Sequence, residues 1–426
     1  MYVRRLTITN IRSIERFDLR LNRDEAPGWH VILGSNGAGK SSVVRSLALA
    51  LAGPKEAVAL RQSWDTWRRY QSRSSSIHLE VDTNPKDIFT KGRRSQSVVA
   101  EIALVDVPST LTGPRVEVIA TAGQPIAERS FWGPNAGWFS ASFGPFRRFT
   151  GGDQAFERLF FSNPRLAPHL SAFGEDVALT EGLRWLRELR VKQLESGEEV
   201  QLLDRLIHFL NNSDLLPHQA IVQEVRTEEI ILIDAGGARV AVEQMSDGYR
   251  SVLSMIFEIL RQMAKAYGPE AMLQALDVEA STVSLPGVVV IDEVDAHLHP
   301  SWQKDIGPWF TRCFPQLQFI VTTHSPIICR NATSVWRLPN PGTEEAAERI
   351  EGIALNRLIH GSILEAYGTD FFGRDVARSE DSRELLSELA HLNRRALRGE
   401  LNADEMARME ELRATLPTLA TDLEAA

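Results

Sequence analysis

The chain has 426 residues, of which 43% are hydrophobic and 24% are charged. This composition is close to that of an average soluble globular protein, so it excludes a collagen-like chain, a disordered chain and a bundle of membrane spans. The 47 lysines and arginines face 56 aspartates and glutamates, which gives a formal net charge of −9. A field of this sign repels a polyanion, so contact with nucleic acid would require a local basic patch.

The two cysteines and the N-terminus indicate the compartment. Cys313 and Cys329 lack the spacing of a zinc ribbon or a disulfide scaffold, which fits a reducing cytosol and implies no structural metal. Residues 1–14 alternate apolar and polar residues instead of forming the apolar core of a signal peptide, and no run of 18 apolar residues occurs. The sequence therefore predicts a cytoplasmic protein that has no contact with a membrane.

The beginning of the chain predicts three strands, a glycine loop and a helix. Apolar and polar residues alternate at residues 3–9 and 17–21, which predicts two short strands around a polar turn. A third strand is expected at residues 29–33, directly before the glycine loop. Residues 41–52 hold uninterrupted helix formers and end at a Gly-Pro stop signal.

The middle of the chain predicts two lobes. A β-rich lobe with basic residues is expected at about residues 54–130. Its strand-like runs are residues 77–81, 98–107 and 116–120. Leucines at helical spacing predict a helical hairpin at residues 181–211, which we place in a helical lobe at about residues 155–217.

The following segments return to strands and then to helices. Residues 221–242 predict short strands, and a helix is expected from residues 246–248 to about Ala266. Apolar runs at residues 288–291 and 319–321 are typical of buried parallel strands.

Residues 381–423 predict two helices with a break at Gly399. Asn402 precedes Glu405 by three residues, as in a capping box. Leucines recur on one face of these helices, so we expect a hairpin that makes protein contacts rather than a catalytic segment. The alternative is that the hairpin packs on its own head.

The most specific motif is the glycine loop. Residues 34–41 read Gly-Ser-Asn-Gly-Ala-Gly-Lys-Ser and fit the P-loop pattern G-x-x-x-x-G-K-[ST]. Glycines allow backbone N–H groups to converge on phosphates, and the helix N-terminus adds a favourable dipole. Lys40 is expected to reach the β- and γ-phosphates of ATP, and Ser41 to hold Mg²⁺. The predicted nucleotide-binding residues are Gly34, Ser35, Asn36, Gly37, Ala38, Gly39, Lys40, Ser41 and Ser42.

Two carboxylates follow the apolar strand at residues 288–291. Asp292 ends this strand, where it can approach the P-loop Mg²⁺, and Glu293 can orient or deprotonate the attacking water. A strand that ends in Asp-Glu is common by itself. Together with the P-loop it predicts an Mg²⁺-dependent ATPase, with Glu293 as the base and with Ser41 and Asp292 as the metal ligands.

Two further polar segments have alternative interpretations. His324 follows a strand and could contact the γ-phosphate or the catalytic water, or it could be an ordinary histidine with local partners. Ser246, Asp247 and Gly248 open a helix whose hydroxyl and N–H groups could bind an anion. The alternative for Ser246 is a simple N-cap.

The order of these segments resembles the ABC-type ATPase heads of the RecF, SMC and OLD group. The resemblance covers about residues 1–340, leaves residues 341–426 as a C-terminal helical region, and implies an α/β P-loop NTPase fold with a mixed sheet. Walker A, signature, Walker B, D-loop and H-loop match residues 34–41, 246–248, 292–293, 297–300 and 324. The turn Asn10-Ile-Arg12-Ser-Ile also looks like the N-terminal turn of this group.

The family resemblance implies that two heads enclose ATP between them. Ser246, Asp247 and Gly248 would then act on the nucleotide of the neighbouring subunit. The signature departs from Ser-Gly-Gly-Gln, and the His-Leu-His-Pro segment is similar to OLD-like and related bacterial ATPases. No Q-loop glutamine is identifiable, although residues 144–148 lie in a plausible region.

Two other groups of residues could bind a ligand. A metal cluster of His297, His299 and His324 is disfavoured, because residues two apart do not face each other on a helix and the site already expects Mg²⁺. Residues 61–73 interleave arginines with Trp64, Trp67 and Tyr70 and could bind nucleic acid through phosphates and base stacking. We favour an insertion whose aromatics pack on the lobe and whose arginines are solvated.

The family resemblance also suggests a biological role. OLD-like proteins carry a nuclease domain after the head, but only about 85 residues follow the last core strand here, less than a typical domain. The resemblance therefore implies a dimer or higher oligomer that controls a separate effector protein, a nuclease in anti-phage defence as in Septu-like systems. The alternative is a RecF-like repair clamp that grips duplex DNA and has no toxic effector.

Overall fold

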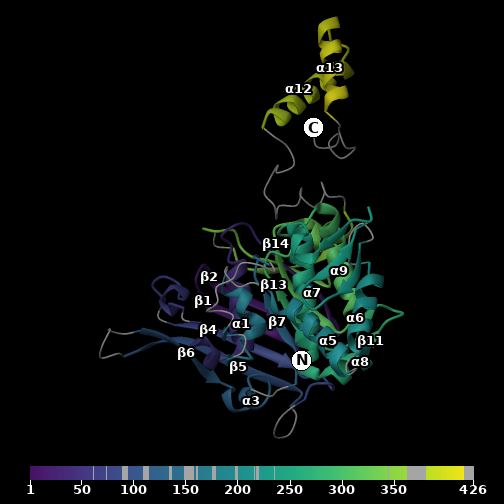
Figure 1. Cartoon of the computed structure of the whole chain (residues 1–426). Helices are drawn as coiled ribbons and strands as arrows, with labels where there is room; N and C mark the ends of the chain where they lie inside the picture. Colours follow the sequence, from purple (N-terminus) through teal and green to yellow (C-terminus); the bar gives the residue numbers. More distant parts are fainter. Residues whose placement is uncertain are drawn as a thin grey trace. The chain divides into compact units, whose positions relative to one another are not determined.

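The computed structural model describes residues 1–60, 62–72, 74–88, 95–108, 115–133, 137–147, 158–159, 162–174, 179–196, 200–214, 216, 220–234, 236–343, 345–361 and 380–416. The chain divides into two compact units, Met1–His360 and Gly361–Ala426 (Figure 1). None of the helices in these described ranges is long and apolar enough to cross a membrane. Every predicted site residue lies in the first unit.

A six-stranded sheet forms the centre of the first unit. Its strand order is β16-β15-β3-β14-β13-β7, with parallel neighbours from β15 to β7 and with β16 antiparallel to β15. The strands are β3 (Gly28–Leu33), β7 (Ser140–Phe143), β13 (Gly287–Ile291), β14 (Leu317–Thr323), β15 (Ser334–Arg337) and β16 (Glu348–Ile350). All residues of β13 and β14 are buried, which explains the apolar runs at residues 288–291 and 319–321 and confirms the predicted parallel strands.

Three long helices pack against this sheet (Figure 1). They are α1 (Lys40–Ala52), α7 (Asp247–Tyr267) and α9 (Pro300–Cys313). Helix α1 contacts β7, β13 and β14, α7 contacts β7, and α9 contacts β3. In α9, a Cβ atom on Gly307 would lie 3.1 Å from the ring of Trp29, so the missing side chain allows this helix to approach the strand closely.

The β-rich lobe is a five-stranded antiparallel sheet with the order β2-β1-β4-β5-β6. Its strands are β1 (Tyr2–Ile11), β2 (Ile14–Arg20), β4 (Ser75–Asp82), β5 (Ser97–Val107) and β6 (Arg115–Ala122). The sheet thus combines the predicted strands of residues 54–130 with both N-terminal strands. The β1–β2 turn is shorter than expected, because Asn10 and Arg12 adopt positive φ angles of 54° and 49° and reverse the chain within a few residues.

The helical lobe contains the predicted hairpin of residues 181–211. It consists of α5 (Glu181–Ser196) and α6 (Val200–Asn212), which pack on each other, and α5 also contacts α7. A small sheet with the order β10-β9-β8 follows, and it confirms the strands expected at residues 221–242. Its strands are β8 (Ile221–Val225), β9 (Ile230–Ile233) and β10 (Arg239–Ala241).

Short elements complete the first unit. The α-helices are α2 (Pro54–Ala57), α3 (Gln124–Arg129), α8 (Pro269–Ala275) and α10 (Gly352–His360), and β11 (Leu276–Asp277) pairs with β12 (Thr282–Val283). The 3₁₀ turns are η1 (Arg23–Glu25), η2 (Trp64–Trp67), η3 (Ala167–Ala172), η5 (Val242–Gln244) and η6 (Pro326–Cys329). Strand β16 and helix α10 belong to this unit, although we expected residues 341–360 in the C-terminal region.

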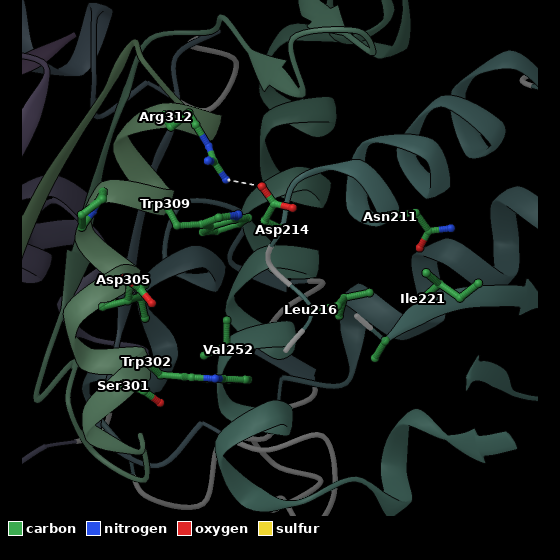
Figure 2. A pocket seen from close by; sticks show the side chains of 13 residues that line it. Asn211, Asp214, Leu216, Ile221, Val252, Ser301, Trp302, Asp305, Trp309 and Arg312 are labelled. Carbon is green, nitrogen blue, oxygen red and sulfur yellow. Dashed lines mark hydrogen bonds and ion pairs between the residues drawn. The ribbon is translucent and has the colours of Figure 1, made fainter. Parts of the chain in front are cut away.

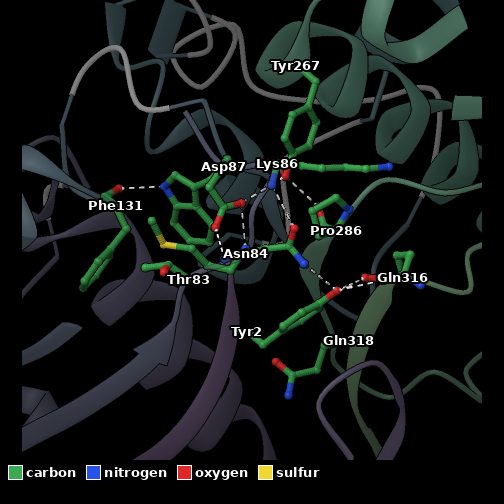
Figure 3. A network of polar contacts seen from close by, with 12 residues as sticks. Tyr2, Thr83, Asn84, Lys86, Asp87, Phe131, Tyr267, Pro286, Gln316 and Gln318 are labelled. Carbon is green, nitrogen blue, oxygen red and sulfur yellow. Dashed lines mark hydrogen bonds and ion pairs between the residues drawn. The ribbon is translucent and has the colours of Figure 1, made fainter. Parts of the chain in front are cut away.

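A polar network joins the β-rich lobe to the central sheet (Figure 3). The hydroxyl of Tyr2 in β1 donates to the carbonyl of Gln316 at 2.9 Å. The buried amide of Gln318 in β14 accepts from the Val3 N–H at 2.7 Å and donates to the Val3 carbonyl at 2.9 Å. Burial raises the pKa of Tyr2 to about 12, so its hydroxyl stays protonated and remains a donor. The two sheets are therefore fixed to each other at the start of β14.

The second unit contains the predicted helical hairpin. Helix α12 (Glu380–Leu397) and helix α13 (Ala403–Thr415) pack on each other through Leu389, Leu392, Met409 and Leu412. The capping box is confirmed: the Asn402 side chain accepts from the Glu405 N–H at 2.8 Å, and the Glu405 carboxylate accepts from the Asn402 N–H at 3.0 Å. Residues 417–423 of the expected hairpin lie outside the described residues.

Candidate active site

The P-loop connects β3 to α1, as the sequence predicts. Gly37 and Gly39 have φ angles of 81° and 100°, a region that favours glycine. A Cβ atom on Gly39 would also lie 2.8 Å from the Ser13 hydroxyl, so the loop packs tightly against the β1–β2 turn. The predicted strand, loop and helix are therefore present, and the glycines of the loop adopt conformations that side chains disfavour.

Lys40 lies at the centre of the site and is 95% buried. Its Nζ atom donates to the carbonyls of Gly34 and Ser35 at 3.0 and 3.2 Å, and it lies 2.6 Å from Nε2 of His324. Burial lowers the pKa of Lys40, although the carboxylate of Glu293 opposes this shift. Burial and the Lys40 ammonium lower the pKa of His324, so a neutral imidazole accepts the bond. The structure thus brings Lys40 and His324 together.

The predicted Asp-Glu pair lies at the end of β13 and beside the end of β14. Asp292 is 1% exposed, and its Oδ1 accepts from the Thr322 hydroxyl at 2.6 Å. The same hydroxyl accepts from the Glu293 N–H at 2.9 Å. The carboxylate of Glu293 lies 3.9 Å from Nε2 of His324. A single threonine thus holds both residues of the pair.

A second threonine makes the corresponding contacts one residue later. The Thr323 hydroxyl donates to Oδ1 of Asp295 at 2.5 Å and accepts from the Ser325 N–H at 2.9 Å. Sequence reasoning identified the polar end of β14 but gave no role to its threonines or to Asp295. The available signal was the Thr-Thr pair itself, which directly follows the apolar run at residues 319–321.

The predicted Q-loop region contains an arginine that contacts the Asp-Glu pair. Arg147 is 97% buried and donates to the carbonyls of Asp292 and Glu293 at 2.8 and 3.0 Å. Burial lowers the pKa of Arg147 to about 10, and the carboxylate of Asp292 is the first of the groups that oppose this shift. Arg147 therefore remains charged at neutral pH. Arg148 lies outside the described residues.

The predicted signature lies at the start of α7. Ser246 occupies the N-cap position, but its side chain makes no capping hydrogen bond, and both Ser246 and Asp247 are exposed. Asp247 forms an ion pair with Arg250. A Cβ atom on Gly248 would lie 2.8 Å from the carbonyl oxygen of His297, so this glycine permits contact between the signature and the D-loop segment of the same chain.

The histidines of the alternative metal cluster have separate contacts. His299 is the N-cap of α9: its Nδ1 lies 2.8 Å from the Ser301 hydroxyl and accepts from the Ser301 N–H. His297 adopts a φ of 65° in the preceding turn. Within the described ranges, no three His, Cys, Asp or Glu side chains form a group that could hold a metal. Mg²⁺ needs no such group, because it is bound by one or two carboxylates together with phosphates and waters.

The tryptophans of the aromatic and basic segment are packed in the lobe. Trp64 and Trp67 are buried, with ring centroids 4.9 Å apart, whereas Tyr70 is 89% exposed. Packing of the tryptophans is therefore confirmed. Arg68 is not solvated as expected, because it forms an ion pair with Asp106 at 2.8 Å. The described residues do not include Arg61 and Arg73.

Two cavities of about 750 Å³ lie near these elements. One adjoins the P-loop and is lined by Ser13, Phe17 and Ala38 and by residues 338–343. Beside it, the Ser35 hydroxyl donates to the Asn340 side chain at 3.1 Å. The other cavity lies between α6, α7 and α9 and contains none of the predicted site residues (Figure 2). The sequence did not indicate the contribution of residues 338–343.

The fold and the order of these motifs resemble those of ABC-type P-loop ATPase heads. Residues 5–104 match the model of a family described as AAA domain. Residues 197–330 match a family described as AAA domain, putative AbiEii toxin, Type IV TA system.

Two curated relatives were compared with the chain. The chain is 22% identical over 346 residues to the Septu protein PtuA of Bacillus mycoides (strain KBAB4). This alignment covers 77% of this chain and 39% of the relative. The chain is 30% identical over 171 residues to the Retron Ec83 probable ATPase of Escherichia coli. This alignment covers 36% of this chain and 30% of the relative. The matched region is thus less than half the length of either relative.

The chain was also compared with solved structures. One of them is the SmcHead bound to the C-winged helix domain of ScpA, at 16% identity and a TM-score of 0.47, with 82% of this chain and 98% of that chain covered. Together with the sequence matches, the motif order confirms the resemblance to ABC-type ATPase heads, with relatives in the Septu and retron groups.

Proposed function

We propose that this protein binds ATP with Mg²⁺ and hydrolyses it at the P-loop. The observation that carries the proposal is the convergence of Lys40, His324 and Glu293: the lysine Nζ lies 2.6 Å from the imidazole Nε2, which lies 3.9 Å from the glutamate. These side chains come from α1, the end of β14 and the end of β13. Such a convergence provides a cation for the phosphates and a carboxylate for the attacking water.

Ser41 and Asp292 fit Mg²⁺ by the chemistry of their donor atoms. A hydroxyl and a carboxylate are the hard oxygen ligands that this ion takes beside phosphate oxygens. Thr322 holds one oxygen of Asp292, so the orientation of the carboxylate is fixed before nucleotide binds. When bound, Mg²⁺ would neutralise charge on the β- and γ-phosphates.

Lys40, His324 and Glu293 have separate roles in the proposed reaction. Lys40 donates to two P-loop carbonyls and His324, and phosphate oxygens would replace some of these partners. His324 stays neutral because burial and Lys40 lower its pKa, so it can accept one hydrogen bond and donate another near the γ-phosphate. Glu293 accepts a proton from water in this proposal.

The signature supports the proposal that two heads enclose the nucleotide. Ser246 is exposed at the N-terminus of a 21-residue helix, and its side chain makes no capping bond. Its hydroxyl and the adjacent backbone N–H groups can therefore donate to a γ-phosphate on another subunit. In the proposal, Ser246, Asp247 and Gly248 act in trans in an ATP-dependent dimer or a higher oligomer.

The proposed biological role is control of a separate effector, a nuclease, in anti-phage defence. The similarity to a Septu protein and to a retron ATPase supports this role. Cys313 and Cys329 are free and buried, which agrees with the proposed cytoplasmic location. The alternative, a RecF-like clamp on DNA, would need a basic surface, and Arg68 is already paired with Asp106.

A comparison of variants tests the ATPase proposal. Lys40→Ala should abolish nucleotide binding, measured with a fluorescent ATP analogue, and phosphate release, measured with Mg²⁺ and with EDTA. Lys55→Ala is the matched control, because the Lys55 side chain is 75% exposed and pairs with the carboxylate of Glu128 on α3. If wild-type protein, purified with its native partner, neither binds nor hydrolyses ATP, the proposal is wrong.

A further inference from the structure

Arg147 connects three parts of the head that are distant in sequence. Its Nη1 donates to the carbonyls of Gly144 and Asp292 at 3.0 and 2.8 Å, and its Nη2 donates to the carbonyl of Glu293 at 3.0 Å. Its Nε donates to the hydroxyl of Ser251 at 2.9 Å. The planar guanidinium thus uses its fixed geometry to hold the Walker B turn and helix α7 at the same time.

The Walker B end of this connection is the backbone of the proposed base. Glu293 has a φ of 46°, a left-handed conformation that is uncommon for a residue with a side chain. Its N–H donates to the Thr322 hydroxyl, and its carbonyl accepts from Arg147. Hydrogen bonds on both sides of the residue therefore maintain this conformation and with it the direction of the carboxylate.

The other end of the connection lies on the signature helix. Ser251 is fully buried in α7, about one turn after Gly248. Its hydroxyl accepts from Arg147, so a shift of α7 along or around its axis would pull on the guanidinium. The bond is shielded from water, because Arg147 is 97% buried.

We propose that Arg147 is a positioning residue that links the position of α7 to the placement of Glu293. The inference rests on the proposed function, in which Ser246 on α7 engages the nucleotide of the other subunit. When Ser246 engages the nucleotide bound to the other subunit, α7 would shift. Arg147 would transmit this shift to Glu293 of the same chain, which is the base of the second composite site. ATP hydrolysis at the two sites would thereby become cooperative. Lysine is a poor substitute, because an ammonium group does not reproduce the fork that meets four acceptors.

The test uses the full chain and three variants. Ser251→Ala removes the bond between Arg147 and α7, and Arg147→Lys removes the fork but keeps the charge. Ser254→Ala is the matched control, because this buried serine of the same helix donates to the Ser251 carbonyl at 3.0 Å and has no bond to Arg147. Amide exchange of residues 291–298 is measured without nucleotide, and ATP turnover, nucleotide affinity and the Hill coefficient are measured with Mg²⁺ present.

The proposal predicts a specific pattern. Exchange of residues 291–298 should rise about fivefold in Ser251→Ala, the effect expected for one lost hydrogen bond, and more in Arg147→Lys. The kcat of Ser251→Ala should fall by a similar factor, with nucleotide affinity unchanged and a Hill coefficient closer to one. Ser254→Ala should match wild type in every measurement.

Three results would overturn the proposal. Exchange in Ser251→Ala that equals wild type shows that α7 is not linked to the Walker B turn. An equal change in Ser254→Ala, or a loss of nucleotide affinity instead of kcat, shows a general structural role. If wild-type protein does not hydrolyse ATP, the proposed function fails, whereas the exchange comparison still decides whether the link exists.

Discussion

Substitution of Thr322 by valine tests how the Asp-Glu pair is held. Valine has nearly the same shape as threonine, so the change removes one hydroxyl and leaves the packing of β14 intact. Two groups then lose a partner: the buried carboxylate of Asp292, which accepts at 2.6 Å, and the partly buried N–H of Glu293, which donates at 2.9 Å. Thr322 is fully buried and Asp292 is 1% exposed, so water does not readily replace the hydroxyl.

The magnitude follows from these two contacts. A hydrogen bond to a charged group is worth about 1.5–3 kcal/mol, and an unsatisfied buried N–H costs about 1–3 kcal/mol. We therefore expect Thr322→Val to destabilise the first unit by about 3 kcal/mol. With about 2.1 cal/mol/K of unfolding entropy per residue over the 360 residues of that unit, this corresponds to a Tm lower by about 4 °C. The kcat for ATP should fall at least about tenfold, because the proposed metal ligand Asp292 and the proposed base Glu293 lose their orientation.

Thr322→Ser provides the control for this experiment. Serine restores the hydroxyl and loses only a methyl group, which costs about 1 kcal/mol. Differential scanning calorimetry and a phosphate-release assay on wild type and both variants separate the contributions. The reasoning is refuted if Thr322→Val keeps the stability and kcat of wild type, or if Thr322→Ser is as impaired as Thr322→Val.

Four other predictions address the site, the fold and the C-terminal unit. Glu293→Gln keeps the side-chain shape but removes the base, so it should trap ATP in a closed dimer; light scattering that finds only monomers for wild type and variant would contradict the enclosed nucleotide. Mixed Ser246→Arg and Lys40→Ala proteins should regain activity through one intact composite site, and heterodimers without activity would indicate a site built in cis. Burial lowers the pKa of His169 to about 3, so below about pH 6.5 the unfolded chain binds a proton that the folded chain does not bind. The free energy of unfolding is therefore highest above pH 6.5 and declines as the pH falls towards 3. His169→Gln should therefore lose about 2 kcal/mol less than wild type between pH 7 and pH 5 in urea titrations, and equal losses would contradict the assignment. Deletion of residues 379–426 should leave folding and ATPase activity intact and remove a copurifying partner or a higher assembly, whereas an insoluble product would indicate that the hairpin packs on its own head.

The elements that the sequence predicts well are those with a local pattern. The glycine loop was predictable because the residues that set its backbone conformation are consecutive. Strands β13 and β14 were predictable from their apolar runs, which are typical of strands buried on both faces. The composition of the β-rich lobe was less informative. Its sheet pairs β1 with β4, for example Leu6 with Leu79, and no local pattern specifies a partner that distant. The lobe was therefore expected at residues 54–130 alone.

The supporting residues of the site were harder to predict for the same reason. The role of Thr322 depends on the register of β14 against β13, in which Val321 is opposite Ile291 and places the threonine beside Asp292. Arg147 is 145 residues from the carbonyl of Asp292 that it binds. Sequence spacing identifies groups that act on a ligand, because that chemistry restricts residue type. It does not identify a buried donor that can be supplied from any neighbouring loop.

The charges of the site explain why such donors are needed. Burial lowers the pKa values of Lys40 and Arg147, and the carboxylates of Asp292, Glu293 and Asp295 oppose this shift in both groups. All three carboxylates therefore act on both cations. With His324 neutral, two cations face three carboxylates, and one negative charge is left uncompensated. This charge would repel the phosphates of a nucleotide that has no bound cation. Mg²⁺ bound to ATP would reverse this balance, because its two positive charges exceed the one negative charge that is left.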